Sequence, residues 1–341
     1  MTRIGLIGCG HIAQVAHLPA LRRLPGVEVV AVADPGAGAI AAETGAAQFA
    51  DAEALLAGSD AEAVVIATPT ATHADLAVAA FAAGRHVYLE KPIALDVADG
   101  RRVVEARRRA GTVGRVGFNF RFNSQVEAAR AALAEGRVGE VVAVRTVFSV
   151  PPQERAGWRG VPGQGGHVLL DVASHHVDLV RHLLADEVVR AFATTRSLRA
   201  EADHATLALE TAGGVGVQTF VSLGSADEFR LDVYGTAGRL TVDRTGAPDA
   251  EITEATFDRA RARRIRRALG HLDPRFLLRS PGHAPSFERA LGAFVGAVRG
   301  ERTPGATLDD GLATLAVVEA ALDSARTGRP VDVTPTSEAS P

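Results

Sequence analysis

The first third of the chain alternates short apolar runs with longer alanine-rich stretches. Several of the apolar runs are continuous rather than alternating, as expected for parallel strands that are covered on both faces. The stretches between them have the length of helices, and glycines stand where they should end. Strand and helix in repetition predict a doubly wound parallel sheet. The predicted strands are Arg3–Gly8, Val27–Ala33, Ala63–Ala67, His86–Glu90 and Val113–Phe118, and the predicted helices are Ile12–Leu24, Ala37–Thr44, His73–Ala83 and Asp96–Ala110.

After about residue 120, strand-like runs follow one another without helices between them. Gly213-Gly214 separates two of these runs, and the turn Gly235-Thr236-Ala237-Gly238 leads into another, as in β-hairpins. The pattern predicts an α+β domain with a large, mostly antiparallel sheet. Its predicted strands are Val141–Val150, Val188–Ser197, Ala205–Thr211, Val215–Leu223, Phe229–Tyr234 and Arg239–Val242, and helices return at Phe287–Arg299 and Gly311–Thr327.

These elements divide the chain into an α/β domain over residues 1–120 and an α+β domain over residues 121–333, followed by a polar tail, 334–341, that we expect to be disordered. A hydrophobic content of 47% and a net charge of −3 are ordinary for a globular protein and provide no basic field for nucleic acid. The single cysteine, Cys9, excludes an intramolecular disulfide. With no signal peptide and no apolar run long enough to span a bilayer, the sequence predicts a soluble, cytoplasmic protein.

A glycine-rich turn closes the first predicted strand. Gly8-Cys9-Gly10-His11-Ile12-Ala13 is a G-x-G-x-x-A fingerprint, in which the glycines allow a tight turn and close approach of a pyrophosphate. Backbone amides at the start of the next helix, around His11 and Ile12, face such phosphates. Asp34, 24 residues after Gly10, stands where an acid binds a ribose 2′-hydroxyl, which favours NAD over NADP. A simple turn residue before Pro35 is the alternative for Asp34.

A third predicted strand ends in Ala67-Thr68-Pro69-Thr70 at the same edge of the sheet. Ligands of open α/β sheets bind beyond the carboxyl ends of the strands. We therefore expect Thr68 and Thr70 to line the dinucleotide, together with His73 at the start of the next helix. For His73, a helix-start residue with a satisfied ring is an equal alternative.

Lysine occurs once in the chain, at Lys91, whereas the other 36 of the 37 basic residues are arginine. A lysine ammonium is a compact charge whose pKa burial lowers, and arginine supplies neither property. The tripeptide Glu90-Lys91-Pro92 ends a strand, so its first two residues should reach the cofactor crevice. Proline restricts the residue before it, or forms a cis bond with it, and either effect aims the Lys91 side chain.

A second constellation is the i, i+4 pair Asp171 and His175, which places both side chains on one helix face. His175 has a pKa range suited to taking a proton from a hydroxyl, and a carboxylate one turn away can orient its imidazole. His176 would point about 100° away around the helix. A solvated Asp–His pair and a metal site are the alternatives. We expect no metal, because no third and fourth ligand stand out.

Taken together, these motifs resemble the Gfo/Idh/MocA oxidoreductase family, which includes glucose–fructose oxidoreductase and the inositol dehydrogenases. The resemblance covers nearly the whole chain, with Ala173 standing where such sequences commonly have glycine. It implies that Lys91, Asp171 and His175 line the substrate beside the nicotinamide, and that the second sheet packs against a partner subunit in homodimers or homotetramers. The motifs that carry it are G-C-G-H-I-A, A-T-P-T with His73, E-K-P, Gly117-Phe118-Asn119-Phe120-Arg121-Phe122, Trp158-Arg159 and G-G-x-x-L-L-D-x-x-x-H-x-x-D.

The sequence therefore predicts NAD(P)-dependent oxidation of a secondary alcohol on a sugar or cyclitol, or the reverse reduction. We expect His175 to take the hydroxyl proton, Lys91 to stabilise charge on the reacting oxygen and Asp171 to position both His175 and the substrate. Further substrate contacts are expected from Asn119, Arg121, Trp158 and Arg159.

Two other functions remain open at this point. One is a glycosidase that oxidises its substrate transiently and then eliminates, and the other is a non-catalytic sugar sensor on the same fold. The arginine-rich segment Phe257–Leu278 could bind a phosphorylated or nucleotide-linked sugar, but such a run is more often a solvated helix face.

Overall fold

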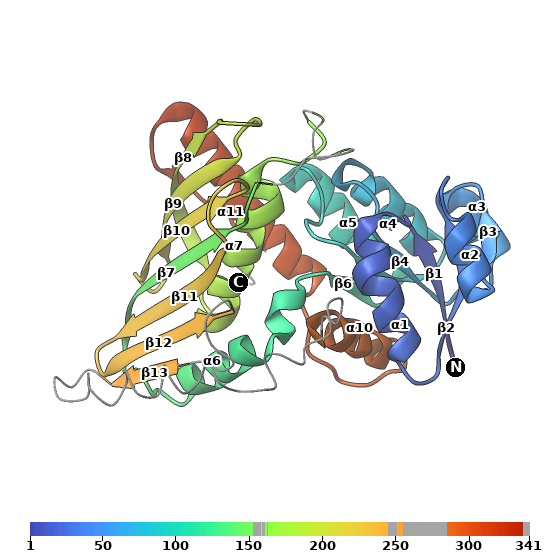
Figure 1. Ribbon diagram of the computed structural model, residues 1–341, viewed down its shortest axis with the longest axis horizontal. Helices are drawn as coiled ribbons and strands as arrows, with labels where there is room; N and C mark the ends of the chain where they lie inside the picture. The colour runs from blue at the N-terminus through green and yellow to red at the C-terminus, as the bar shows by residue number, and fades with distance from the viewer. Residues whose placement is uncertain (153–157, 159–160, 162, 245–250, 255–284, 337–341) are drawn as a thin grey trace.

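The computed structural model describes the chain except for residues 153–157, 159–160, 162, 245–250, 255–284 and 337–341. Two sheets lie at opposite ends of the molecule, with helices between them (Figure 1). Arg159, the whole of the arginine-rich segment Phe257–Leu278 and most of the predicted tail lie outside the described residues. Among the helices that are described, none combines the length and the apolar character needed to cross a membrane.

The first sheet has six parallel strands in the order β3-β2-β1-β4-β5-β6. All five predicted strands are present, which confirms the doubly wound parallel sheet; β3, with three residues, is too short to show a pattern in the sequence. The strand order reverses between β1 and β4, and ligands bind at such a switch point. The strands are β1 (Thr2–Ile7), β2 (Val27–Ala33), β3 (Ala47–Phe49), β4 (Ala63–Ile66), β5 (His86–Leu89) and β6 (Gly114–Val116).

Helices cover both faces of this sheet because successive side chains of a strand point to opposite sides. Val64 and Ile66 of β4 pack into one core with residues of α4 and α5, whereas Ala63 and Val65 pack into a second core with residues of α1 and α10. The helices of this half are η1 (Ala13–His17), which is a π-helical turn, α1 (Leu18–Arg23), α2 (Gly38–Thr44), α3 (Ala52–Gly58), η2 (Thr70–Thr72), α4 (His73–Ala82) and α5 (Val97–Ala110).

The second sheet has eight strands in the order β13-β12-β11-β7-β10-β9-β8-β14. Only the β7–β10 pair is parallel among the described pairs, and both predicted hairpins, β9–β10 and β11–β12, are formed. The predicted mostly antiparallel sheet is therefore confirmed. The strands are β7 (Val141–Ser149), β8 (Val188–Arg196), β9 (His204–Thr211), β10 (Gly216–Ser222), β11 (Glu228–Gly235), β12 (Gly238–Asp243), β13 (Glu251–Glu254) and β14 (Val331–Asp332).

One face of this sheet packs on helices, and the other is open. In β8 and β9, buried residues alternate with more exposed ones, as in a sheet that is covered on one side. Figure 1 shows α7 and α11 between this sheet and the first. The helices of this half are η3 (Asn119–Phe122), α6 (Ser124–Ala134), the π-helical turn η5 (Leu169–Ala173), α7 (Ser174–Leu184), α10 (Pro285–Val298) and α11 (Leu308–Thr327).

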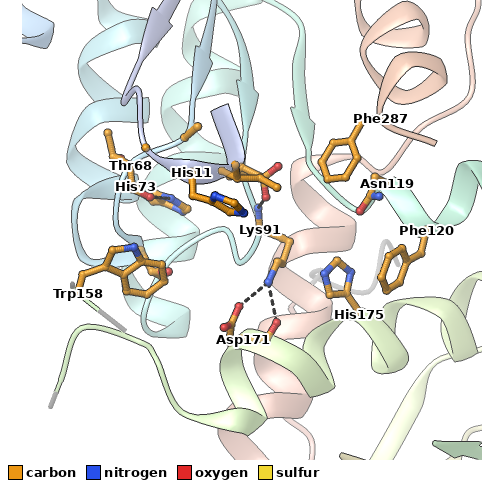
Figure 2. Close-up of a pocket in the computed structure, with 15 residues that line it drawn as sticks. His11, Thr68, His73, Lys91, Asn119, Phe120, Trp158, Asp171, His175 and Phe287 are labelled. Atoms are coloured by element: carbon orange, nitrogen blue, oxygen red, sulfur yellow. Dashed lines mark hydrogen bonds and ion pairs between the residues drawn. The ribbon is translucent and has the colours of Figure 1, made fainter. Parts of the chain in front are cut away.

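Helix α10 returns to the first sheet, although it follows the second sheet in sequence. Its residues Leu291 and Phe294 are buried with Leu21 of α1 and Tyr88 of β5. This return places Phe287, near the start of α10, at the carboxyl edge of the first sheet, opposite the η5–α7 segment (Figure 2).

Candidate active site

A cavity of about 320 Å³ opens between the carboxyl edge of the first sheet and the η5–α7 segment. Figure 2 shows how side chains from both sides converge on it. The cavity brings together all three predicted catalytic residues and all the predicted cofactor residues except Gly8 and Asp34. Its lining consists of Gly10, His11, Ile12, Ala67, Thr68, Thr70, His73, Glu90, Lys91, Asn119, Phe120, Trp158, Asp171, His175 and Phe287.

The glycine turn after β1 has a shape that a dinucleotide requires. Gly8 has a φ of +88°, and a Cβ on it would lie 2.7 Å from the backbone of Ala67, so a side chain does not fit there. A Cβ on Gly10 would meet nothing within 4 Å. Because Gly10 lines the cavity, its backbone is open to close approach by a phosphate.

Asp34 follows β2 beside this turn. Its carboxylate accepts hydrogen bonds from the N–H of Cys9 at 2.9 Å and from the N–H of Gly36 at 2.7 Å. The second bond forms the local turn that the alternative interpretation of Asp34 predicted, and the first ties the carboxylate to the glycine turn. Burial and, secondarily, the charge of Asp34 raise the pKa of the Cys9 thiol to about 11, so the thiol is neutral. The open turn and the adjacent acid fit a dinucleotide.

His73 connects two segments of the cavity wall. Its ring is buried, with Nδ1 2.7 Å from the carbonyl oxygen of Pro92 and Nε2 3.0 Å from that of Thr68. Burial lowers the pKa of His73, although both carbonyl groups act in the opposite direction. The ring therefore joins the end of β4 to the segment that follows β5. Both sequence interpretations of His73 hold in part, since the ring is satisfied and it also lines the cavity.

Lys91 projects into the cavity from the end of β5, and the Lys91–Pro92 peptide bond is cis. Its Nζ donates hydrogen bonds to the backbone carbonyl of Asp171 at 2.6 Å and to the Oδ1 atom of the same residue at 2.7 Å (Figure 2). Both side chains are mostly buried, at 13% and 12% exposure, so the pair is partly shielded from solvent screening. Lys91 thus lies in the crevice, as its position at a strand end predicted, and the structure shows that it contacts Asp171 there.

The imidazole of His175 is held by aromatic rings. It stacks on Phe120 with ring centroids 4.3 Å apart, and Phe118 and Phe148 meet it edge-on at 6.1 and 6.5 Å. Its Nδ1 is buried without a hydrogen-bond partner among the described residues, which leaves Nε2 to face the cavity. Burial, followed by the charge of Lys91, lowers the pKa of His175 well below 6.5. The ring is therefore neutral near pH 7 and able to accept a proton.

Asp171 was predicted to orient His175, and the structure differs on this point. The Oδ1 atom of Asp171 accepts from Lys91, and in the part of the chain that the structure describes no hydrogen bond joins the carboxylate to His175. Asp171 acts on His175 through charge alone, which partly offsets the lowering of the pKa. The physical reason is competition, because an ammonium at 2.7 Å is a stronger partner for a carboxylate than a neutral imidazole.

The predicted substrate residues divide into two groups. Asn119 and Trp158 line the cavity, and the side-chain amide of Asn119 donates to the hydroxyl of Ser286 at 3.0 Å. Arg121 does not line it. Its guanidinium instead forms two hydrogen bonds with the buried carboxylate of Asp178, at 2.6 and 2.8 Å, so its role in the structure is to join η3 to α7. Arg159 lies outside the described residues.

His176 is excluded from the cavity. Its ring is fully buried between Phe148 and Phe229, and burial, with a smaller effect of Arg244, lowers its pKa to about 3. His176 thus packs in the interior, and His175 is the histidine of this pair that reaches the site. This outcome agrees with the choice made from the i, i+4 spacing.

Three aromatic or imidazole residues at the site were not predicted. Phe120 stacks on His175, Phe287 lines the cavity from α10, and His17 lies behind Glu90. Phe120 is adjacent to Asn119 in sequence and belongs to the same motif, so the sequence indicated this segment but not the role of Phe120. Neither His17 nor Phe287 carries a local signal, since both reach the site through tertiary packing. In the described part of the chain, no group of three His, Cys, Asp or Glu side chains is arranged to hold a metal ion.

Comparison with known proteins agrees with this geometry. Residues 2–118 match a family described as an oxidoreductase family with an NAD-binding Rossmann fold, and residues 130–333 match the C-terminal alpha/beta domain of that family. The chain is 33% identical to 1,5-anhydro-D-fructose reductase of Ensifer adhaerens, over 98% of this chain and 99% of that protein. It is 30% identical to inositol 2-dehydrogenase of Rhizobium meliloti, over 97% and 99%. Among solved structures, the WlbA dehydrogenase from Bordetella pertussis in complex with NADH and UDP-GlcNAcA superposes with a TM-score of 0.83, at 28% identity over 98% of both chains.

Proposed function

The chain belongs to the Gfo/Idh/MocA oxidoreductase family, and on that premise we propose that its cavity interconverts a secondary alcohol and a ketone on a sugar or cyclitol. NAD, when bound along the glycine turn, supplies the hydride acceptor for the oxidation. The observation that carries the proposal is the convergence of Lys91, Asp171 and His175 on one cavity with that turn. The family assignment makes the chain an NAD(P)-dependent oxidoreductase. Relatives are named as dehydrogenases and reductases, and neither the glycosidase nor the sensor alternative is favoured by them.

His175 acts as the general base in this proposal. Its neutral ring presents Nε2 to the cavity, where the substrate hydroxyl releases its proton. Because the stack on Phe120 limits rotation of the ring, Nε2 is aimed before the substrate arrives. In the reverse reduction the same atom returns the proton to the oxygen.

Lys91 provides positive charge at the reacting oxygen. Negative charge develops on that oxygen as its proton leaves, and an ammonium fixed by two hydrogen bonds is already oriented to stabilise it. Asp171 fixes the ammonium by accepting both of these hydrogen bonds. The three residues therefore divide the work into proton transfer, charge stabilisation and positioning.

The residues present also support a preference for NAD. Gly10, His11 and Ile12 would hold the pyrophosphate, and Asp34 would accept from a ribose hydroxyl. A ribose 2′-phosphate would bring a second negative charge beside the Asp34 carboxylate, which is unfavourable. We expect reduced cofactor to form faster with NAD than with NADP. A strong NADP preference would contradict the role given to Asp34.

The reacting part of the substrate is proposed to be an uncharged polyol. Among the described lining residues, Lys91 is the only lysine or arginine, and it is paired with Asp171, while the acidic residue Glu90 also lines the cavity. A phosphate at the reacting ring would therefore meet two carboxylates and a single, already paired ammonium.

A substrate panel tests this proposal directly. NADH formation is measured across inositols, aldoses, their phosphates and sugar nucleotides. We expect turnover with an uncharged ring, free or as the sugar of a nucleotide conjugate. Cleavage of a glycosidic bond without net NADH would instead support oxidation followed by elimination.

We further propose a cytoplasmic homodimer or homotetramer that assembles through the open face of the second sheet. Phe192 of β8 and Tyr234 of β11, each 36% exposed, lie on this face with Val147, as the strand registers show. Exposed aromatic residues on a sheet face are typical of a buried contact. Light scattering should give a mass of two or four times 35.5 kDa, and Phe192→Glu should lower it. A monomer in the wild type would contradict the assembly.

A further inference from the structure

We propose that His17 is a positioning residue for the reaction, acting on Lys91 through Glu90. The inference rests on the proposed function, since it concerns the charge that Lys91 places at the reacting oxygen. His17 does not line the cavity, and nothing in the sequence pattern distinguishes it. Its place in the structure nevertheless connects the helix after the glycine turn to the backbone of Lys91.

The ring of His17 is held rigidly inside the first domain. Its side chain is fully buried, and its Nε2 lies 2.8 Å from Oε1 of Glu90. Tyr88 and Phe287 meet the ring edge-on, with centroids 5.8 and 5.4 Å away. Packed side chains on two sides thus keep Nε2 within 2.8 Å of the carboxylate, at an angle that lies outside ordinary hydrogen-bond geometry.

Glu90 is the acceptor in its contact with His17. Burial would raise the pKa of Glu90, but its contacts with His17 and the charge of Lys91 together lower that pKa below its ordinary value. An ionised carboxylate only accepts hydrogen bonds, so the N–H side of this 2.8 Å contact belongs to Nε2 of His17, although the contact does not have the angle of a full hydrogen bond. A buried carboxylate that loses such a donor becomes unfavourable, because no water replaces it.

Glu90 also contacts the backbone of Lys91. Its Oε2 accepts a hydrogen bond from the backbone N–H of Lys91 at 3.0 Å. The carboxylate also packs so closely on Gly117 that a Cβ there would lie 3.0 Å from Oε1. Both oxygens therefore have a close polar neighbour, Nε2 of His17 at 2.8 Å and the backbone N–H of Lys91 at 3.0 Å. At the other end of the tripeptide, His73 contacts the carbonyl oxygen of Pro92.

The consequence is a specific kinetic effect. Without the His17 donor, the Glu90 carboxylate is free to turn, and the Lys91 backbone loses a fixed acceptor. A displacement of the ammonium by about 1 Å costs on the order of 100-fold in rate. The substrate and cofactor surfaces of the cavity do not include His17, so KM and NADH affinity should change little.

The test compares three substitutions at His17 with a matched control. His17→Leu removes the donor, His17→Gln keeps a nitrogen donor near the Nε2 position, and His17→Asn is polar but too short to reach Glu90. The control is His86→Leu at the other end of β5, where Nδ1 of His86 accepts from the N–H of Val113 at 2.9 Å. Both His17 and His86 form a polar contact near β5, but only His17 lies beside Glu90.

The chain offers a readout of Lys91 that does not depend on activity. Because Lys91 is the only lysine, protein labelled with lysine that carries ¹³C at Cε alone gives a single lysine side-chain resonance. We expect His17→Leu and His17→Asn to shift this resonance and to lower kcat by about 10- to 100-fold. By the same argument, we expect the kcat of His17→Gln to stay within about 3-fold of the wild type. His86→Leu should lower Tm but change neither the lysine resonance nor kcat. If His17→Leu fails to fold, the comparison of His17→Gln with His17→Asn still tests whether His17 positions Lys91.

A double-mutant cycle tests the route through Glu90. If His17 acts through Glu90, the kcat losses of His17→Asn and Glu90→Gln will be strongly non-additive. Additive losses, an unshifted lysine resonance in both His17→Leu and His17→Asn, or a kcat loss in His86→Leu as large as that in His17→Leu would overturn the inference. Absence of NADH formation by the wild type with every substrate would refute the proposed function instead, while the resonance would still report on positioning.

Discussion

Replacing Phe120 by leucine tests whether an aromatic stack, rather than a carboxylate, holds the base. The ring of Phe120 lies 4.3 Å from that of His175, with an interplanar angle of 26°. Such a pair contributes about 0.5–1.5 kcal/mol beyond its buried area. If that energy is lost from the reactive orientation, kcat falls by about 2- to 13-fold, since 1.36 kcal/mol is tenfold in rate.

The same substitution should change the pH dependence. Burial is the largest cause that lowers the pKa of His175, and leucine opens the ring to cavity water. The pKa then rises toward 6.5. Because the base works only when neutral, the acid limb of kcat/KM for oxidation moves to higher pH.

The assay is kcat/KM for NADH formation between pH 4.5 and 8, with Phe229→Leu as the control. Phe229 packs edge-on against Phe120 at 5.1 Å but makes no ring contact with His175. We expect the control to retain the acid limb of the wild type. An unchanged rate and an unchanged limb in Phe120→Leu, or an equal effect of both variants, would refute the role of the stack.

Two further predictions concern stability. Arg121→Met leaves the buried Asp178 carboxylate without its main partner and should cost about 3–5 kcal/mol in urea unfolding. Arg190→Met, in the exposed pair with Asp332, should lower the unfolding free energy far less. Similar losses for both would contradict the account of the buried pair. His176 has a folded-state pKa of about 3, so the unfolded state takes up its proton first as pH falls below 6.5, and stability drops until pH reaches about 3. His176→Phe should therefore reduce the slope of unfolding free energy against pH by about 1.4 kcal/mol per unit between pH 6 and 4, and an unchanged slope would show that the ring is not buried neutral.

Much of the fold was predictable because its strands carry their own pattern. Continuous apolar runs marked the buried parallel strands, and the glycine turns marked the two hairpins of the second sheet. The return of α10 to the first sheet was not predictable, since an amphipathic helix does not specify which sheet it covers. For the same reason, Phe287 was not expected at the site.

The candidate site was likewise predictable where local sequence determines position, and not where tertiary packing does. Thr68 and Lys91 both line the cavity, as the sequence predicted, because the carboxyl ends of neighbouring parallel strands share one edge. Arg121 was expected at the substrate, but its carboxylate partner Asp178 lies 57 residues away in sequence, and such pairing is visible only in the folded chain. The spacing of Asp171 and His175 was informative, yet it did not show that Lys91 competes for the carboxylate.

The most direct test of the central claim is NADH formation by the wild type and by Lys91→Arg on the substrate found in the panel. Arginine at this position is bulkier and planar, so it neither fits the two contacts with Asp171 nor presents a compact charge to the reacting oxygen. We predict that Lys91→Arg forms NADH at least 100-fold more slowly at saturating substrate while its Tm stays within a few degrees of the wild type. Near-normal turnover by this variant would contradict the account.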